Sequence, residues 1–190
     1  DLRRHNRRKL AFPSNGYSKK QDNTSNFSNK TILRGSEGPH KMSFVLKTLT
    51  TKEEVDEIIR NTEDKVVVLR FGRDTDAVCL QHDDILAKAE RDLAKMAVIR
   101  LVDVDRASEY VKYFDISLIP ATVFFFNATH MKCDYGTQDH TKFIGAFNSK
   151  QDFIDLVEGF YRCAMKGKHI VNCPIDPRHI PKYQLIYKNI

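Results

Sequence analysis

Apolar residues between positions 42 and 113 alternate between unbroken runs and helical spacing. The run VVVLRF at 66–71 is rich in β-branched residues, which predicts a strand buried on both faces. A second run at 97–104 predicts another strand, and helical spacing predicts helices at 78–95 and 107–113. The apolar positions of the longer helix are Leu80, Ile85, Leu86, Ala89 and Leu93. Alternation of this kind is typical of parallel strands joined by helical crossovers.

The residues before the first run predict a short strand and then a helix with a defined start. Residues 44–46 are apolar enough for an initial strand. Thr51 and Glu54 have the spacing of a capping box, in which each side chain bonds the backbone N–H of the other residue. One helical face beyond them is apolar, with Val55, Ile58 and Ile59. The sequence therefore predicts a helix that begins after Thr51 and packs on the sheet.

The second half of the chain changes to an antiparallel pattern. TVFFF at 122–126 and the segment 131–135 predict two strands, and the residues between them predict a tight hairpin connection. Residues 136–148 predict a long loop. A closing helix is expected to begin near Ser149 and to end at Gly167. Its apolar face holds Phe153, Leu156, Val157, Phe160, Tyr161 and Ala164.

The order of these elements is β-α-β-α-β-α-β-β-α, which predicts an α/β fold with a mixed central sheet and helices on both faces. We expect a disordered basic tail at 1–41, a compact domain at 42–167 and a C-terminal extension at 168–190. The change from polar to globular composition at Met42 favours the interpretation that the tail is translated upstream sequence.

The positive charge of the chain lies in the tail. The sequence has 31 Lys and Arg against 25 Asp and Glu, and ten of the basic but only three of the acidic residues fall within 1–41. The domain is close to neutral, which argues against direct nucleic-acid binding by the domain. A basic cluster in the tail remains open as a nuclear-import or RNA-binding patch: Arg3, Arg4, Arg7, Arg8 and Lys9. The sequence has no apolar run of membrane-spanning length.

The cysteines and aromatic residues give weak signals for chemistry. The four cysteines form no CxxC motif, which favours a reducing compartment over a disulfide scaffold. His130 and Cys133 would point to opposite faces of a strand, so we expect no metal site there and no cofactor. Phenylalanines at 124–126 resemble a base-stacking platform, but a strand covered by helices on both faces has the same composition.

The C-terminal extension is too apolar for a solvated tail. Three prolines at 172–190 limit helix formation, yet aliphatic and tyrosine side chains are frequent there. The candidate interface residues are Ile175, Ile180, Tyr183, Leu185 and Tyr187. The residues leave two alternatives open, in which the extension packs on its own domain or contacts a partner or second subunit.

The order of elements is similar to that of thioredoxins, whose dithiol Cys-x-x-Cys follows the second strand and faces a cis proline. Pro120 stands at the matching place, but the dithiol segment reads Asp76-Ala-Val-Cys79. A carboxylate cannot attack a disulfide, and a single thiol cannot release a mixed disulfide. Arg70 also replaces the acid that thioredoxins bury on the second strand. We interpret Asp76, Cys79 and Pro120 as a degenerate redox site in a thioredoxin-like fold without catalytic residues.

The alternative is a monothiol oxidoreductase or redox sensor that uses Cys79. Such a role requires an accessible thiol with a lowered pKa. A cysteine at the resolving position is usually shielded, and the carboxylate of Asp76 one turn away would raise its pKa. The sequence therefore favours the interpretation without redox activity.

Longer stretches resemble the DIM family of thioredoxin-like splicing factors over residues 42–190. They include VLRFGRDTDAVCLQHDDIL, YFDISLIPATVFFFN and CPIDPRHIPKY. The resemblance implies a nuclear, non-enzymatic factor in pre-mRNA splicing and cell-cycle progression. It also implies a TPR-repeat scaffold protein of the spliceosomal tri-snRNP as partner, and a homodimer. One branch of the family carries a cysteine after the cis proline that can pair with the helix cysteine, and Ala121 excludes that bridge here.

Overall fold

The computed structural model describes residues 45–183, and the observations below refer to that part of the chain. The strands are β1 (Thr48–Leu49), β2 (Val66–Gly72), β3 (Ala97–Asp103), β4 (Ala121–Phe126), β5 (Thr129–Asp134), β6 (Phe143–Ile144) and β7 (Ile170–Asn172). The helices are α1 (Lys52–Asn61), α2 (Ala77–Leu93), α3 (Ser108–Tyr113) and α4 (Lys150–Ala164). The tail expected at 1–41 and the boundary expected at 42 lie outside the described residues.

The central sheet is mixed, as predicted. Its strand order is β1-β3-β2-β4-β5-β7, and β6 pairs with β4 beside this path. The central strand β2 is parallel to β3 and antiparallel to β4. β4 and β5 form the predicted hairpin. Its two connecting residues, Asn127 and Ala128, both have positive φ, which is typical of a type I′ turn.

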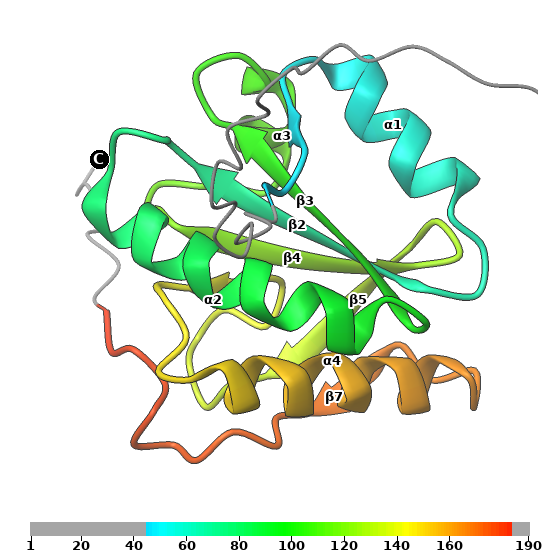
Figure 1. Ribbon diagram of the computed structural model, residues 1–190. Helices are drawn as coiled ribbons and strands as arrows, with labels where there is room; N and C mark the ends of the chain where they lie inside the picture. Colours follow the sequence, from blue (N-terminus) through cyan, green and yellow to red (C-terminus); the bar gives the residue numbers. More distant parts are fainter. Residues whose placement is uncertain (1–44, 184–190) are drawn as a thin grey trace, which may run out of the picture. The chain divides into compact units, whose positions relative to one another are not determined.

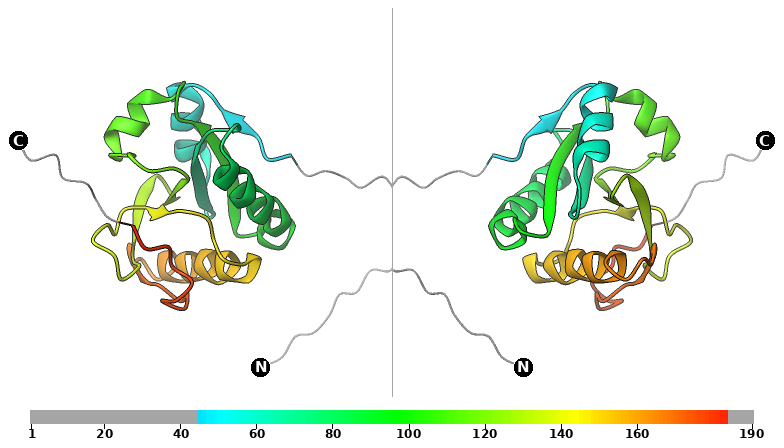
Figure 2. Two further views of the ribbon diagram at one scale, coloured as in Figure 1. Left: turned by 90° about the vertical axis from the view of Figure 1, so that its left-hand side faces the viewer. Right: turned by 90° about the vertical axis from the view of Figure 1, so that its right-hand side faces the viewer.

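Helices cover both faces of the sheet, with α1 and α3 on one face and α2 and α4 on the other (Figure 1, Figure 2). Alternate residues of β2 divide between the two cores. Val67 and Leu69 pack with α1 and α3, whereas Val66 and Val68 pack with α2 and α4. Arg70 belongs to the second set by its position, so its charged side chain is directed beneath α2. This orientation determines the chemistry of the site described below.

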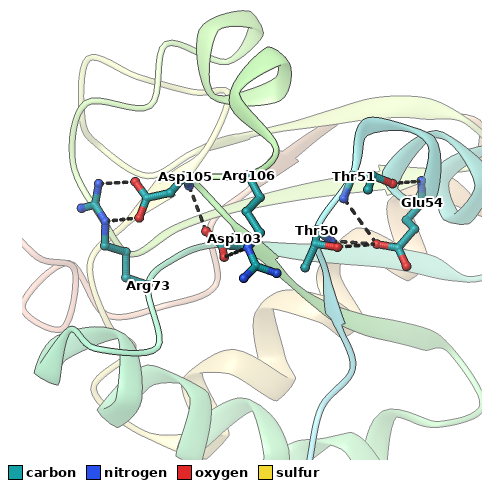
Figure 3. Close-up of polar contacts among 7 residues, drawn as sticks. All are labelled: Thr50, Thr51, Glu54, Arg73, Asp103, Asp105 and Arg106. Carbon is teal, nitrogen blue, oxygen red and sulfur yellow. Dashed lines mark hydrogen bonds and ion pairs between the residues drawn. The ribbon is translucent and has the colours of Figure 1, made fainter.

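The helices begin where the sequence predicts. The hydroxyl of Thr51 accepts a hydrogen bond from the Glu54 N–H, and the Glu54 carboxylate accepts one from the Thr51 N–H, both at 3.3 Å (Figure 3). The predicted capping box is therefore confirmed. Ser149 caps α4 by accepting from the Asp152 N–H at 3.1 Å. Gly167 follows that helix with φ +70°, a conformation that favours glycine.

The expected position of the first strand is wrong. The sequence predicts residues 44–46, but β1 is Thr48–Leu49. Its parallel register with Leu101 and Val102 of β3 determines which residues join the sheet. Leu46 is 4% exposed and belongs to the core without joining the ladder, which explains its apolar character.

Two further expectations differ in detail. The loop expected at 136–148 contains β6, whose two residues pair with Ala121 and Thr122 of β4. Leu80 was expected on the buried face of α2 but is 53% exposed. The buried stripe of α2 instead contains Cys79, His82, Leu86, Ala89 and Leu93.

Candidate functional site

The segment that corresponds to the thioredoxin dithiol joins β2 to α2, and Asp76 is the N-cap of α2. Its Oδ1 accepts a hydrogen bond from the backbone N–H of Cys79 at 2.8 Å. This bond and the Cys79 thiol hold the pKa of Asp76 below its ordinary value. The carboxylate thus satisfies a helix start whose N–H groups lack intrahelical partners. It is a structural anion and not a nucleophile toward sulfur.

Cys79 is completely buried at the start of α2. Burial raises the pKa of its thiol to about 11, and the hydrogen bond to Asp76 acts in the same direction. The sulfur packs tightly over Gly72 together with Arg70. A methyl group on Gly72 would lie 2.5 Å from Cys79 Sγ and 2.7 Å from Arg70 Nη1. This environment keeps the thiol protonated at neutral pH, which is the opposite of an activated cysteine.

We expect Cys79 to resist alkylation in the folded chain. At pH 7.5, a pKa of about 11 leaves roughly one Cys79 thiol in 3,000 as the reactive thiolate, and burial blocks access further. Iodoacetamide labelling followed by peptide mass spectrometry measures this directly. The partly exposed Cys163 and Cys173 provide internal controls. Labelling of Cys79 as fast as in the denatured chain would contradict the assignment.

An ion pair lies beside Cys79 where thioredoxins have a buried acid. Arg70 is 3% exposed, and its Nε donates to Asp83 Oδ1 at 2.6 Å while its Nη2 donates to Asp83 Oδ2. Burial raises the pKa of Asp83, and the guanidinium of Arg70 opposes that effect. Arg70 cannot accept a proton, and the Asp83 carboxylate is occupied by Arg70. The loss of the acid was predicted from the sequence, but the partner Asp83 was missed.

His82 extends this buried polar group and was also missed. Its Nδ1 accepts from the Phe147 N–H at 3.4 Å, and its Nε2 lies 3.1 Å from Thr122 Oγ1. The ring stacks on Phe147 with centroids 5.1 Å apart. Burial and the charge of Arg70 lower the pKa of His82 to about 3, so the imidazole is neutral. A sequence signal existed, because His82 lies three residues after Cys79 and four before Leu86 on one helical stripe.

The predicted proline precedes β4 with a cis Ile119-Pro120 peptide bond. The Pro120 carbonyl accepts a hydrogen bond from the Gly145 N–H at 2.8 Å, which joins this loop to the end of β6. The next residue, Ala121, is buried and carries no sulfur. The position after the proline therefore has no thiol that Cys79 can pair with.

The loop that carries Asp76 is tied to the loop after β3. Nε and Nη2 of Arg73 donate to Oδ2 and Oδ1 of Asp105, both at 2.7 Å (Figure 3). The Asp105 N–H donates to Asp103 Oδ1 at 2.9 Å, and Arg106 Nε lies 3.6 Å from Asp103 Oδ2. The Arg73 pair is exposed and adds little stability, but its bidentate geometry orients the two loops.

The candidate interface residues of the C-terminal extension have different environments. Ile175 is 5% exposed and lies in the core formed with α2 and α4, and Ile180 packs against that core. The Tyr183 hydroxyl donates to Thr137 Oγ1 at 3.5 Å. Leu185 and Tyr187 lie outside the described residues. Ile175 and Ile180 thus follow the alternative in which the extension packs on its own domain, and Ile175 has little surface to offer a partner.

A cavity of about 380 Å³ lies between α1 and α3 and was not anticipated. Ile59, Phe114 and Phe125 are its buried lining, and Tyr113 stands at its edge with 79% of its surface exposed. The Asp56 carboxylate in its wall already accepts hydrogen bonds from Tyr110 and Lys52. The cavity is therefore lined partly by aromatic rings, and its Asp56 carboxylate already has hydrogen-bond partners. Such a cavity is better suited to ligand binding than to proton transfer.

Two further observations on the described residues concern metal ligands and membrane-spanning helices. Within 45–183, no three His, Cys, Asp or Glu side chains gather closely enough to hold a metal ion. His130 donates from Nε2 to the Thr141 carbonyl, 2.9 Å away. In the same range, no helix has the length and apolar character needed to cross a membrane.

Comparison with known proteins gives one consistent set of similarities. The family model described as mitosis protein DIM1 matches residues 45–177. The chain is 64% identical to thioredoxin-like protein 4B of Homo sapiens over 149 residues, which are 78% of this chain and 100% of that protein. It is 34% identical to spliceosomal protein DIB1 of Saccharomyces cerevisiae over 137 residues, which are 72% and 96% of the two chains. A mutant thioredoxin from Halobacterium salinarum NRC-1 has a TM-score of 0.50 at 16% identity, over 60% and 89% of the two chains. The predicted thioredoxin-like fold is confirmed.

Proposed function

Because the chain belongs to the mitosis protein DIM1 family, we propose that it is a protein-interaction factor in nuclear pre-mRNA splicing with a role in cell-cycle progression. The names of its relatives support this assignment, since one relative is named a spliceosomal protein and the family model is described as mitosis protein DIM1. In this proposal the thioredoxin fold presents surfaces to partners and performs no thiol–disulfide exchange.

The observation that carries the non-redox part is the placement of Asp76. Its carboxylate caps α2 at the point where a thioredoxin needs a sulfur nucleophile, and it accepts the Cys79 N–H at 2.8 Å. Cys79 is buried and has a raised pKa, and the Arg70–Asp83 pair replaces the proton acceptor. Nucleophile, thiolate and base are thus all lost.

Two finer assignments belong to the proposal. The partner is a TPR-repeat scaffold protein of the spliceosomal tri-snRNP, and the chain associates with itself as a homodimer. The aromatic cavity between α1 and α3 supports a role in binding, because tyrosine and apolar anchors are frequent in protein interfaces.

Insulin reduction tests the redox part. We expect the full chain to reduce insulin no faster than the dithiothreitol blank, with a thioredoxin as positive control. The Cys79→Ala variant should have the same rate as the wild type, because the thiol takes no part. Turnover that disappears in Cys79→Ala would overturn the proposal and support a monothiol oxidoreductase.

Affinity purification tests the splicing part. The tagged full chain, captured from nuclear extract and analysed by mass spectrometry, should retain the TPR-repeat scaffold protein with other tri-snRNP components. Cys79→Ala should retain equal amounts. Recovery without any tri-snRNP component would contradict the splicing assignment.

Light scattering over a range of concentrations tests the homodimer, and a monomer at every concentration would refute it.

A further inference from the structure

Two cysteines that are far apart in sequence are neighbours at one edge of the sheet. Cys133 lies on β5, opposite Val171 of the parallel strand β7, and Cys173 follows β7. The Cys173 N–H donates to the Asp134 carbonyl at 3.4 Å, so the pairing continues past the end of β7. Side chains two residues apart on a strand share a face. Cys173 therefore projects on the same side as Val171 and Cys133, and all three contact the core beneath α4.

The two thiols interact electrostatically with each other and with Tyr135. Each thiol shifts the pKa of the other, and Tyr135 acts to lower the pKa of Cys133. The Cys133 thiol and the Ile175 N–H stabilise a negative sulfur at Cys173 and lower its pKa, although burial and Asp134 oppose this. The interaction with Cys173 and burial raise the pKa of Cys133. The pair therefore has one sulfur suited to attack and one that stays a thiol.

Only one of the two sulfurs can be reached from solvent. Cys133 has no exposed surface, whereas Cys173 is partly exposed and lines a cavity of about 310 Å³. Tyr135, Ile175 and Lys182 also line that cavity. A small reagent that enters the cavity meets Cys173, whereas the buried Cys133 does not line it.

We propose that Cys173 and Cys133 form a peroxide-sensitive dithiol, with Cys173 as the attacking and Cys133 as the resolving sulfur. The Cys173 thiolate attacks one oxygen of hydrogen peroxide, the O–O bond breaks, and Cys173 becomes a sulfenic acid as hydroxide leaves and takes a proton from solvent to give water. The sulfur of Cys133 then attacks the sulfur of Cys173, and the Cys133 proton passes to the departing hydroxyl, which leaves as a second water. Two thiols are oxidised to one disulfide while one peroxide is reduced to two waters.

The proposed bond would attach the start of the C-terminal extension covalently to β5. Cys173 lies one residue beyond β7, which ends at Asn172. The site does not involve Asp76, Cys79 or Pro120. The proposed dithiol can therefore be tested independently of the function proposed above.

Tryptic peptide mapping of the full chain tests the proposal, because trypsin places each cysteine on a separate peptide. Cys79, Cys133, Cys163 and Cys173 fall on peptides 74–88, 133–142, 163–166 and 169–178. The reduced protein is treated with hydrogen peroxide, alkylated in denaturant so that buried thiols are also labelled, and digested. We expect a cross-linked pair of peptides 133–142 and 169–178 with a mass two hydrogens below their sum, while Cys79 and Cys163 remain alkylated.

Variants assign the two roles. Cys173→Ser should abolish the cross-link, and Cys133→Ala should replace it by a sulfenic acid on Cys173 that dimedone traps. Cys163→Ser is the matched control and should leave the cross-link unchanged. Oxidation of Cys163 before Cys173 would overturn the proposal. So would conversion of Cys173 to a sulfinic acid in the wild type without any cross-link. Wild-type mapping decides the matter even if a variant fails to fold.

Discussion

Replacing Arg70 by leucine should lower the free energy of unfolding by about 3–5 kcal/mol, because it leaves a largely buried carboxylate without its partner. The Asp83 side chain is 17% exposed and takes a bidentate contact from Arg70, whose own side chain is 3% exposed. Burial already raises the pKa of Asp83 against the opposing effect of Arg70. Without the guanidinium, the carboxylate must be buried unpaired or take up a proton. Urea unfolding at neutral pH measures the loss.

The double replacement Arg70→Leu with Asp83→Leu separates the ion pair from the shape of the site. Apolar residues of similar volume often replace a buried pair at little net cost, so the double variant should recover most of the lost stability. With Asp83→Leu measured as well, the loss in the double variant minus the sum of the two single losses gives the coupling energy between the two residues. A double variant as unstable as Arg70→Leu would show that Arg70 acts through packing over Gly72 and Cys79 instead.

Lys88→Leu provides the matched control on the same helix. Lys88 pairs with Asp84, but their side chains are 63% and 58% exposed. Water already solvates both groups, so removing Lys88 should change the free energy of unfolding by less than about 0.5 kcal/mol. Equal losses in Arg70→Leu and Lys88→Leu would contradict the view that burial determines the importance of the pair.

The contrast between Asp83 and Asp84 shows where sequence reasoning stops. The two carboxylates are adjacent on α2, yet only Asp83 meets Arg70 beneath the helix. Helical spacing places Asp83, four residues after Cys79 and three before Leu86, beside the buried stripe, but it does not identify Arg70 as the partner. The sequence alone shows that Arg70 replaces a buried acid. Its partner Asp83 is identified only in the folded structure.

The same distinction separates the elements that were predicted from those that were not. The run at 66–71 and the capping box at Thr51 carry their own signals, which are continuous burial and a pair of side chains three residues apart. β6 and β7 have two and three residues and exist because β4 and β5 offer pairing groups. Short strands of this kind have too few residues for a period, so only the assembled sheet reveals them.

Lowering the pH from 7 to 5 should reduce the free energy of unfolding by about 2 kcal/mol through His82 alone. Its pKa is about 3 in the folded chain, against an ordinary value of 6.5. The unfolded chain therefore protonates the His82 imidazole below about pH 6.5, whereas the folded chain protonates it only below about pH 3. Stability from this group is complete above pH 6.5 and declines throughout that window.

The geometry explains why His82 stays neutral. Its Nδ1 accepts the Phe147 N–H at 3.4 Å, so a proton on Nδ1 would place two donors against each other. Arg70 adds a positive charge nearby, and the ring has no exposed surface through which water can solvate an imidazolium. Protonation thus requires breaking the link between α2 and the segment after β6, which couples acid sensitivity to the core.

His82→Gln isolates this contribution, because glutamine can bond Thr122 but does not titrate in this range. The variant should lose most of the slope of unfolding free energy between pH 7 and pH 5, where few carboxylates titrate. A smaller slope should remain from His130, whose pKa burial also lowers. The exposed His140→Gln serves as the matched control for the replacement of a histidine by glutamine. A slope unchanged in His82→Gln would show that His82 is already protonated in the folded chain at pH 5, contrary to the hydrogen bond that its Nδ1 accepts.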